Sequence, residues 1–447
     1  MEQSYHFIGI GGIGMSALAS ILIEKGIKVS GSDAQGSYMI DRLKDKGAEI
    51  TIGHAAENIK NPTAVVFSTA IREDNPEVIA ARQKKVPFIH RSELLRQLMK
   101  ESRALLVTGT HGKTTTSSLL AHTLTVCNLK PSYAIGGVVQ SLSANGGYGT
   151  GEYFVAEADE SDGSFLRYTP FGAIITNIDN DHLDHWQTMD DMVAGFEQFA
   201  DSVTSKEHLF FCGDDDKLVS LDLEGYSYGF GETNDLYIKN FIQEGWKSTF
   251  DCTFEGKEYT DIAVPLVGAH NVLNASAVFG LGLKLKVKEE CLRKAFLEFR
   301  GITRRAECKG EINGITILDD YAHHPSEIFA TLHALKNAIG KRRLVVLFQP
   351  HRYTRTRDCF HEFTTAFQPS DLLVLTDIYA ASEAPIPGIT TQALVEQMQK
   401  SSTIDVRYCP FEELTAYMQR FLKPQDLCVT MGAGNITQIG PAFLKGG

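Results

Sequence analysis

The sequence predicts an α/β fold with mostly parallel sheets, divided into three domains. Apolar runs of strand length alternate with helical patterns along almost the whole chain, and two of these strands lead into glycine-rich loops that open helices. The length of 447 residues suits two to three hydrophobic cores. We expect the domains at residues 1–103, 104–303 and 304–447.

The first domain opens with a glycine loop. A strand at 6–8 leads into this loop, a helix follows at 15–25, and a short strand at 28–31 ends near Asp33. The G-x-G-x-x-G spacing is typical of Rossmann-like domains, in which the helix N-terminus holds a diphosphate and the acidic residue binds a ribose. The pattern alone fits NAD, another nucleotide diphosphate, or glycines used only for packing. The candidate ligand-binding residues are Gly9, Gly11, Gly12, Ile13, Gly14 and Asp33.

A second glycine loop follows a strand at 104–107 and precedes a helix at 115–126. It predicts a P-loop domain, in which Lys113 reaches the β- and γ-phosphates of ATP and the Thr114 hydroxyl holds Mg²⁺. The match is imperfect, because Val107 stands where the first glycine of that motif is expected. Two phosphate loops favour two nucleotide-type ligands over one redox cofactor. The candidate ATP-binding residues of this loop are Gly109, Thr110, His111, Gly112, Lys113, Thr114 and Thr115.

Acidic residues follow two further strands of the middle domain. Four carboxylates between Glu157 and Asp162 follow a strand at 154–156, and His182 lies among the carboxylates that follow a strand at 173–176. Mg²⁺ prefers one or two carboxylates together with phosphate oxygens, so we expect one metal site here. A solvated acidic loop remains an alternative for the first group. The middle domain also contains a Gly/Ser/Asn-rich stretch at 141–151, expected to be flexible, and an expected β-rich insertion at 222–267.

The end of the middle domain carries further candidates for contacts with a nucleotide. His270 and Asn274 lie one helical turn apart, where an amide could read the adenine edge. The alternative is that the neighbouring Asn271 simply caps the helix. Arg304 and Arg305 can reach a γ-phosphate on domain closure or form a solvated linker.

The third domain again alternates strands and helices, with strands expected at 315–318, 344–348, 372–376 and 428–431 and a helix at 325–338. Asp320 and His323 follow the first of these strands, and His351, Arg352 and Arg355 follow the second. Ligands bind at the carboxyl ends of strands in open α/β sheets. Two arginines three positions apart beside histidines form a candidate carboxylate clamp.

Composition excludes several classes of function. The net charge of −12 argues against nucleic acid or an anionic membrane as a partner. The eight cysteines form no C-x-x-C pair, so we expect reduced thiols in the cytoplasm rather than disulfides or a zinc site. The N-terminus lacks the pattern of a signal peptide, and no apolar run is long enough for a membrane helix.

Seven motifs along nearly the whole chain together resemble the Mur ligases of peptidoglycan synthesis, and the last two favour the alanine-adding branch. They are GIGGIGMS (9–16), GTHGKTTT (109–116), AEADESDGSFL (156–166), TNIDNDHLD (176–184), GAHNVLNA (268–275), DDYAHHPSEI (319–328) and FQPHRYTRTRD (348–358). The shortened phosphate loop is the form found in this family. One departure is Asn435, where the family more often has Asp.

The resemblance implies an ATP-dependent ligase that joins L-alanine to UDP-N-acetylmuramate through an acyl phosphate, as a monomer or homodimer. It implies that the first domain binds UDP rather than NAD, and that Thr114, Glu157 and His182 hold Mg²⁺, or Mn²⁺ in its place. His270, Asn274, Arg305 and Asp320 would contact ATP. His323, His351, Arg352 and Arg355 would position alanine, and one hypothesis is that His351 removes a proton from its amine. Of these residues Lys113, Glu157, His182, His351, Arg352 and Arg355 form the expected catalytic set.

Three alternatives remain open at this point. A recycling ligase would attach a pre-made peptide to the same nucleotide sugar. An NAD-dependent dehydrogenase would use the first glycine loop but leave the ATP loop and the third domain unexplained. A non-catalytic regulator would bind ATP without releasing phosphate in response to an acceptor.

Overall fold

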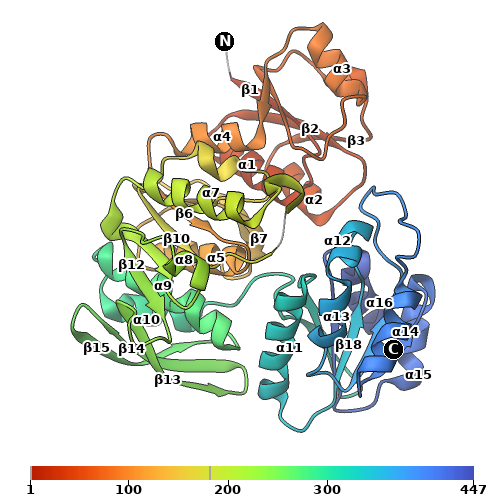
Figure 1. Ribbon diagram of the computed structural model, residues 1–447. Helices are drawn as coiled ribbons and strands as arrows, with labels where there is room; N and C mark the ends of the chain where they lie inside the picture. The colour runs from red at the N-terminus through yellow and green to blue at the C-terminus, as the bar shows by residue number, and fades with distance from the viewer. Residues whose placement is uncertain (1–2, 181–182, 447) are drawn as a thin grey trace. The chain divides into compact units, whose positions relative to one another are not determined.

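The computed structural model describes residues 3–180 and 183–446, which form three sheets covered by helices (Figure 1). The chain divides into two compact units. The first consists of Met1–Asn240, Phe250–Ile262 and Leu273–Arg300, and the second of Phe241–Thr249, Ala263–Val272 and Gly301–Gly447. The α/β class with predominantly parallel sheets is therefore confirmed, whereas the predicted domain boundaries stay predictions.

The first sheet has the strand order β3-β2-β1-β4-β5 and is parallel throughout. Its strand–loop–helix opening confirms the predicted Rossmann-like start of the chain. The elements are β1 (Ser4–Ile8), α1 (Ile13–Glu24), β2 (Lys28–Asp33), α2 (Tyr38–Asp45), β3 (Glu49–Ile52), η1 (Ala56–Asn58), β4 (Ala64–Phe67), α3 (Pro76–Gln83), β5 (Phe88–His90) and α4 (Arg91–Met99).

The second sheet has ten strands in the order β15-β14-β13-β12-β11-β10-β6-β9-β7-β8. The expected β-rich insertion forms its strands β12 to β15. The elements are β6 (Arg103–Thr108), α5 (Lys113–Val126), β7 (Ser132–Val139), β8 (Ala144–Gly147), β9 (Tyr153–Glu157), η2 (Ser164–Arg167), β10 (Gly172–Ile175), α6 (Leu183–Trp186), α7 (Met189–Ser202), η3 (Lys206–His208), β11 (Leu209–Cys212), α8 (Asp216–Val219), β12 (Tyr226–Gly229), β13 (Leu236–Glu244), β14 (Lys247–Phe254), β15 (Lys257–Val264), α9 (Ala269–Lys284) and α10 (Glu289–Glu298).

The third sheet has the order β16-β17-β21-β18-β19-β20, with β16 antiparallel to β17 and the remaining pairs parallel. Its elements are β16 (Glu307–Ile312), β17 (Ile315–Asp320), α11 (Pro325–Ile339), β18 (Leu344–Phe348), α12 (Tyr353–Asp358), α13 (Phe360–Ala366), β19 (Leu372–Leu375), α14 (Thr391–Ser401), β20 (Asp405–Tyr408), η4 (Phe411–Glu413), α15 (Leu414–Phe421), β21 (Leu427–Met431), η5 (Asn435–Gln438) and α16 (Ile439–Gly446).

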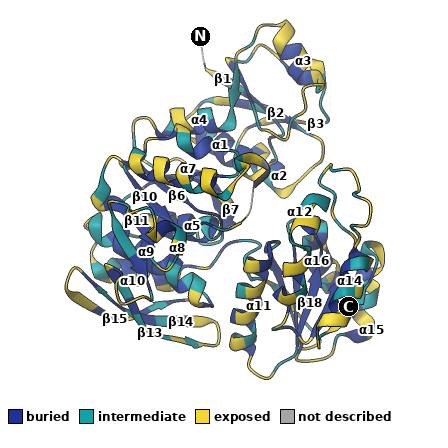
Figure 2. Cartoon of the chain, viewed as in Figure 1, coloured by how far each residue is buried: buried dark blue, intermediate teal, exposed yellow. Residues whose placement is uncertain are grey.

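The apolar strands predicted from the sequence form the cores. Every residue of β18, β19 and β21 is buried, as expected for strands covered by helices on both faces. Figure 2 shows buried central strands and helices that are exposed along one face, whereas the strands β13 to β15 are partly exposed. Within the part of the chain described, no helix combines the length and the apolar character needed to cross a membrane.

Two sequence-based expectations are wrong. The stretch at 141–151 was expected to be flexible, but it contains β8, a fully buried strand that packs against α1. A Cβ on Gly146 would lie 2.4 Å from the Ala17 carbonyl oxygen, so the glycines here allow close approach of two backbones. The thiols of Cys127 and Cys291 were expected to be reduced, but they form a disulfide between the end of α5 and α10. The missing C-x-x-C spacing could not reveal a pair 164 residues apart.

Candidate active site

The second glycine loop has the geometry of a phosphate-binding loop. It leaves the end of β6 and reaches α5 through Gly109 and Gly112, whose φ angles of +123° and +85° favour glycine. A Cβ on Gly109 would lie 2.1 Å from Thr176 Oγ1, so the loop has no room for a side chain there. The loop therefore presents the N-terminus of a 14-residue helix at the carboxyl edge of the sheet.

Lys113, the first residue of α5, is held by four contacts. Its ammonium donates to the carbonyl oxygens of Gly109 at 2.6 Å and Thr110 at 3.2 Å, and to both carboxylate oxygens of Glu160 at 2.9 and 2.8 Å. Burial opposes the charged form of Lys113, but Glu160 and Asp159 outweigh burial and raise the Lys113 pKa. Burial also raises the pKa of Glu160, to about 7. Lys113 therefore stays cationic beside a carboxyl that titrates near neutrality.

Glu157 contacts hydroxyl groups in the first two turns of α5. It ends β9 and accepts hydrogen bonds from Thr114 Oγ1 at 3.3 Å, Ser117 Oγ at 3.1 Å and the Gly136 amide at 2.6 Å. A threonine hydroxyl beside a carboxylate supplies the oxygen donors that Mg²⁺ prefers. His182, the third expected metal ligand, lies outside the described residues.

The other carboxylates of the acidic run have different partners. Arg91, the first residue of α4, donates through Nη2 to Asp159 Oδ2 at 2.8 Å and to Asp162 Oδ2 at 3.4 Å. Glu160 pairs with Lys113. The run is thus neither a solvated loop nor a four-carboxylate metal site. Sequence reasoning missed Arg91 and the pairing of Glu160 with Lys113, because no local pattern connects these residues to their partners.

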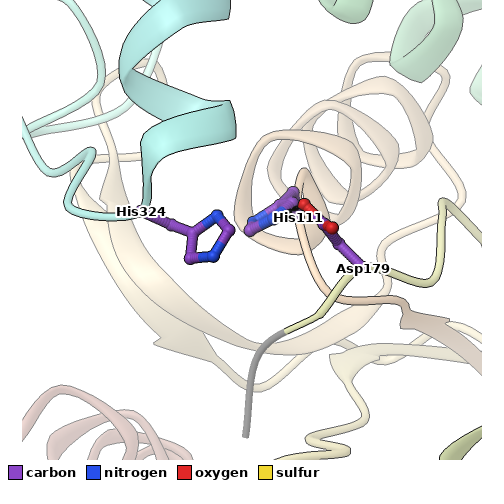
Figure 3. Close-up of side chains that lie close together, drawn as sticks. All are labelled: His111, Asp179 and His324. Atoms are coloured by element: carbon purple, nitrogen blue, oxygen red, sulfur yellow. Dashed lines mark hydrogen bonds and ion pairs between the residues drawn. The ribbon is translucent and has the colours of Figure 1, made fainter. Parts of the chain in front are cut away.

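A histidine–aspartate pair closes the phosphate loop on its other side. Figure 3 shows the side chains of His111 and Asp179 next to one another. His111 Nε2 lies 3.0 Å from Asp179 Oδ2, and the His111 amide donates to the side chain of Asn177 at 2.9 Å. The Asp179 amide in turn donates to Thr110 Oγ1 at 2.9 Å. These contacts fix the loop to the segment that follows β10.

The predicted adenine-contacting residues both lie in α9, and one of them reaches the phosphate loop. A Cβ on Gly112 would lie 2.8 Å from Asn274 Oδ1, so this amide faces the N-terminus of α5. His270 belongs to the second unit, where burial and Arg305 lower its pKa to about 4. Asn271 donates to the Val267 carbonyl at 2.8 Å. Contact of His270 and Asn274 with adenine stays a prediction.

The first glycine loop places some of its amides out of reach of a ligand. The Gly11 amide donates to Asp33 Oδ2 at 2.9 Å, and the Gly12 amide to the Gly9 carbonyl at 3.2 Å. Among the described residues, no hydrogen-bond partner is found for the amides of Ile13 and Gly14 in the first turn of α1. Of the predicted ligand-binding residues in this loop, Ile13 and Gly14 are therefore the ones whose amides have no partner in the described chain, and binding through Gly11 requires Asp33 to move.

In the second unit, Asp320 lies at the end of β17. Its two oxygens accept from the amides of Ala306 at 2.6 Å and Ala322 at 2.8 Å, and burial raises its pKa to about 6. Arg305 Nη1 lies 3.8 Å from Glu327 Oε1. Asp320 therefore holds the residue that precedes β16 and the turn that follows β17, and its contact with ATP stays a prediction.

The predicted alanine clamp comes together after β18. Arg355 Nη1 lies 3.3 Å from His351 Nδ1, and the His351 ring stacks on Tyr379, with ring centroids 5.6 Å apart. Because a guanidinium only donates, His351 Nδ1 accepts and the ring proton lies on Nε2. Burial, His323 and Arg355 lower the His351 pKa to about 3, so the ring is neutral and a weak base.

Two more residues complete this cluster. The His323 ring lies 6.0 Å from the His351 ring, and the Arg352 amide donates to the Tyr379 carbonyl at 2.8 Å. Arg352 has a φ of +70°, an unusual conformation that this hydrogen bond helps to hold. Sequence reasoning missed Tyr379, which lies beyond the motif. Asn435 accepts from the Gln349 side chain at 2.8 Å, a structural contact that does not require an aspartate.

Comparison with known proteins assigns the family. The chain is 45% identical over 446 residues to the UDP-N-acetylmuramate–L-alanine ligase of Protochlamydia amoebophila, covering 100% of this chain and 98% of the relative. The chain belongs to the Mur ligase family. Three family profiles match its successive parts: "Mur ligase family, catalytic domain" at residues 4–103, "Mur ligase middle domain" at 107–282 and "Mur ligase, glutamate ligase domain" at 304–434.

Solved structures agree with this assignment to the Mur ligases. The UDP-N-acetylmuramate-alanine ligase MurC from Thermotoga maritima matches with a TM-score of 0.87 and 29% identity, over 99% of this chain and 98% of that one. A murein peptide ligase from Psychrobacter arcticus matches with a TM-score of 0.74 over 99% of this chain and 98% of that one. At 21% identity, the second similarity supports the fold alone.

Proposed function

We propose that this Mur ligase joins L-alanine to the lactyl carboxylate of UDP-N-acetylmuramate, forming ADP and phosphate through an acyl phosphate in peptidoglycan precursor synthesis. The observation that carries the proposal is the 45% identity, over the whole chain, to a relative with this activity in its name. The two motifs of the third sheet that favour the alanine-adding branch support it.

The arrangement around α5 suits the first half of the reaction. The amides at the start of α5 and the Lys113 ammonium would bind the β- and γ-phosphates of ATP, and Asn274 faces the same loop. Thr114 and Glu157, as a hydroxyl and a carboxylate in hydrogen-bond contact, fit Mg²⁺ and would hold it together with His182. Bound Mg²⁺ stabilises the charge on the transferring phosphoryl group.

Lys113 has to exchange a partner before it acts. Its ammonium is bound to both oxygens of Glu160. A γ-phosphate would take the place of that carboxylate, and the raised pKa of Glu160 allows the displaced carboxyl to accept a proton near neutral pH. Lys113 thereby stays positioned and cationic when the γ-phosphate of ATP and the lactyl carboxylate of the substrate come together.

The cluster after β18 suits recognition of a small amino acid. Arg352 and Arg355 supply cationic groups for its carboxylate, as the spacing predicted. The lowered pKa makes His351 a poor acceptor for the proton of the amine. We therefore assign His351 a positioning role, with its Nε2–H as a donor, in place of the general-base role considered from the sequence.

The recycling ligase remains the second candidate, and the acceptor decides between the two. The experiment measures phosphate release from ATP with UDP-N-acetylmuramate and Mg²⁺, with L-alanine, glycine, L-serine or a tripeptide as the acceptor. Release that depends on both the nucleotide sugar and L-alanine supports the proposal. Release with the tripeptide but not with L-alanine would move the chain to the recycling branch, and release with no acceptor at all would refute both.

A further inference from the structure

The connection between β19 and α14, residues 376–390, folds back onto the predicted alanine clamp. The Tyr379 amide donates to the Pro350 carbonyl at 2.8 Å, and the Tyr379 carbonyl accepts from the Arg352 amide at 2.8 Å. The Tyr379 ring also stacks on the His351 ring, at an interplanar angle of 9°. The beginning of this connection is therefore fixed to the segment that follows β18.

Glu383 joins the same connection to α12, the helix that carries Arg355. Its carboxylate accepts two hydrogen bonds from Thr354, one from the amide to Oε2 at 3.0 Å and one from the hydroxyl to Oε1 at 2.7 Å. Thr354 directly precedes Arg355, whose Nη1 lies 3.3 Å from His351 Nδ1. The carboxylate therefore holds the backbone next to Arg355 in place.

Glu383 is half-buried and carries a negative charge. Burial opposes the charged form, but the hydrogen bonds from Thr354 and the charge of Arg352 outweigh burial and lower the Glu383 pKa. Hydrogen bonds to an ionised acceptor are stronger than those between neutral groups. The negative charge therefore strengthens the attachment of the connection to α12.

The backbone before Glu383 adopts an unusual conformation. Ala381 and Ser382 have φ angles of +49° and +71°, and the turn is closed by the Glu383 amide, which donates to the Ala380 carbonyl at 2.9 Å. Positive φ is unfavourable for residues other than glycine and persists where surrounding contacts hold it. The contacts of Glu383 thus hold a turn that is unfavourable by itself.

We propose that Glu383 is a positioning residue of the alanine clamp, which fixes α12 so that Arg352 and Arg355 present their guanidinium groups to the carboxylate of the amino acid. The inference rests on the proposed function, because the clamp is assigned to L-alanine there. Glu383 acts through Thr354 and not by contact with the amino acid. Cations that are held in place before the amino acid arrives lose less conformational entropy on binding.

The test compares KM values from phosphate release, with L-alanine, ATP and UDP-N-acetylmuramate varied in turn. Glu383→Ala should raise the KM for L-alanine about 10- to 100-fold, because two hydrogen bonds to a charged acceptor are lost, and leave the other two KM values unchanged. Glu383→Gln should raise it less, because the amide oxygen still accepts one of the two hydrogen bonds. Asp377→Asn is the matched control, since this carboxylate of the same connection accepts from the Phe411 amide at 2.9 Å and the Tyr408 hydroxyl at 2.5 Å.

A second pair of variants changes the donor and tests the inference even if Glu383→Ala fails to fold. Thr354→Val removes the hydroxyl but keeps the amide and the branched shape, so it should raise the KM for L-alanine about 3- to 10-fold. Thr354→Ser keeps the hydroxyl and should match wild type.

Two outcomes would overturn the inference. One is an unchanged KM for L-alanine in Glu383→Ala, or in Thr354→Val if the first variant does not fold. The other is a similar rise in all three KM values, which would show a purely structural role.

A failure of the proposed function is separable from a failure of this inference. Wild type that releases phosphate only with a tripeptide acceptor would refute L-alanine as the substrate, and the variants are then compared by their KM for the tripeptide. Wild type that releases no phosphate with any acceptor would refute both.

Discussion

The buried pair of Lys113 and Glu160 makes a strong prediction about stability and activity together. Glu160 has no exposed surface, and both its oxygens contact the Lys113 ammonium, at 2.9 and 2.8 Å. Removing one partner of a buried ion pair costs about 3–5 kcal/mol, because the other charge is left uncompensated. Replacing both by neutral groups of similar size costs far less. We expect Lys113→Met to lower the free energy of unfolding of its unit by about 3–5 kcal/mol, and Glu160→Gln added to it to restore most of that loss.

The contribution of Glu160 to the free energy of unfolding should decrease as the pH rises. Burial raises the pKa of Glu160 to about 7 from its ordinary value of 4.5, so the folded state favours the protonated carboxyl. Its contribution to stability is therefore complete below pH 4.5 and is lost as the pH rises through about 7. Lys113 lowers the pKa of Glu160, so this pKa rises further in Lys113→Met. The variant should therefore continue to lose stability above pH 8, where the contribution of Glu160 in wild type has levelled off.

The double variant should regain stability relative to Lys113→Met but should not regain activity. Lys113→Met and the double variant should both lose on the order of 10³-fold or more in rate, because the cation that stabilises the transferring phosphoryl group is absent from each. The assays are denaturant unfolding followed by circular dichroism and phosphate release from ATP. Lys294→Met, an exposed lysine that pairs loosely with Glu298 at 3.8 Å, is the control. A double variant no more stable than Lys113→Met, or one with near-normal turnover, would refute the reasoning.

Three further predictions concern the loop, the metal and the third sheet. Gly109→Ala should destabilise the first unit by about 1–3 kcal/mol and weaken ATP binding, because its φ is +123° and the new Cβ would meet Thr176 Oγ1; unfolding and nucleotide titration measure this. Glu157→Gln should raise the Mg²⁺ concentration needed for half-maximal phosphate release at least about 10-fold, since a carboxylate oxygen donor loses its charge; a Mg²⁺ titration of turnover measures this. The His351 pKa is lowered from 6.5 to about 3, so its contribution to stability is present above pH 6.5 and lost as the pH falls toward 3. His351→Gln should therefore lose less stability than wild type between pH 7 and 5, as read from unfolding midpoints.

Each of these has a result that would contradict it. Wild-type stability and ATP affinity in Gly109→Ala would mean that the loop tolerates a side chain. An unchanged Mg²⁺ requirement in Glu157→Gln would remove this residue from the metal site. Identical pH profiles for wild type and His351→Gln would mean that the histidine is not held neutral by its surroundings.

The sequence by itself determined the α/β class, the two glycine loops and the β-rich insertion. These features depend on residues that are close together in the sequence. Apolar runs form buried strands, and the turn before α5 needs a positive φ at two positions, Gly109 and Gly112, that are both glycine. The predicted strand, loop and helix around Lys113 are found where the pattern placed them. For the same reason the clustering of His351 with Arg355, four positions along the chain, was predictable.

Only the tertiary structure decided which partner each charged group has. The four carboxylates from the last residue of β9 onward look alike in the sequence, yet one faces Thr114, one pairs with Lys113 and two bind Arg91. The contact of Arg91 with Asp159 joins residues 68 positions apart, and the disulfide joins cysteines 164 positions apart. The glycine-rich stretch at 141–151 is a buried strand because α1 packs on it, not because of its own propensity. Local patterns specify elements, but pairing across the fold depends on how those elements pack, which one segment of sequence does not contain.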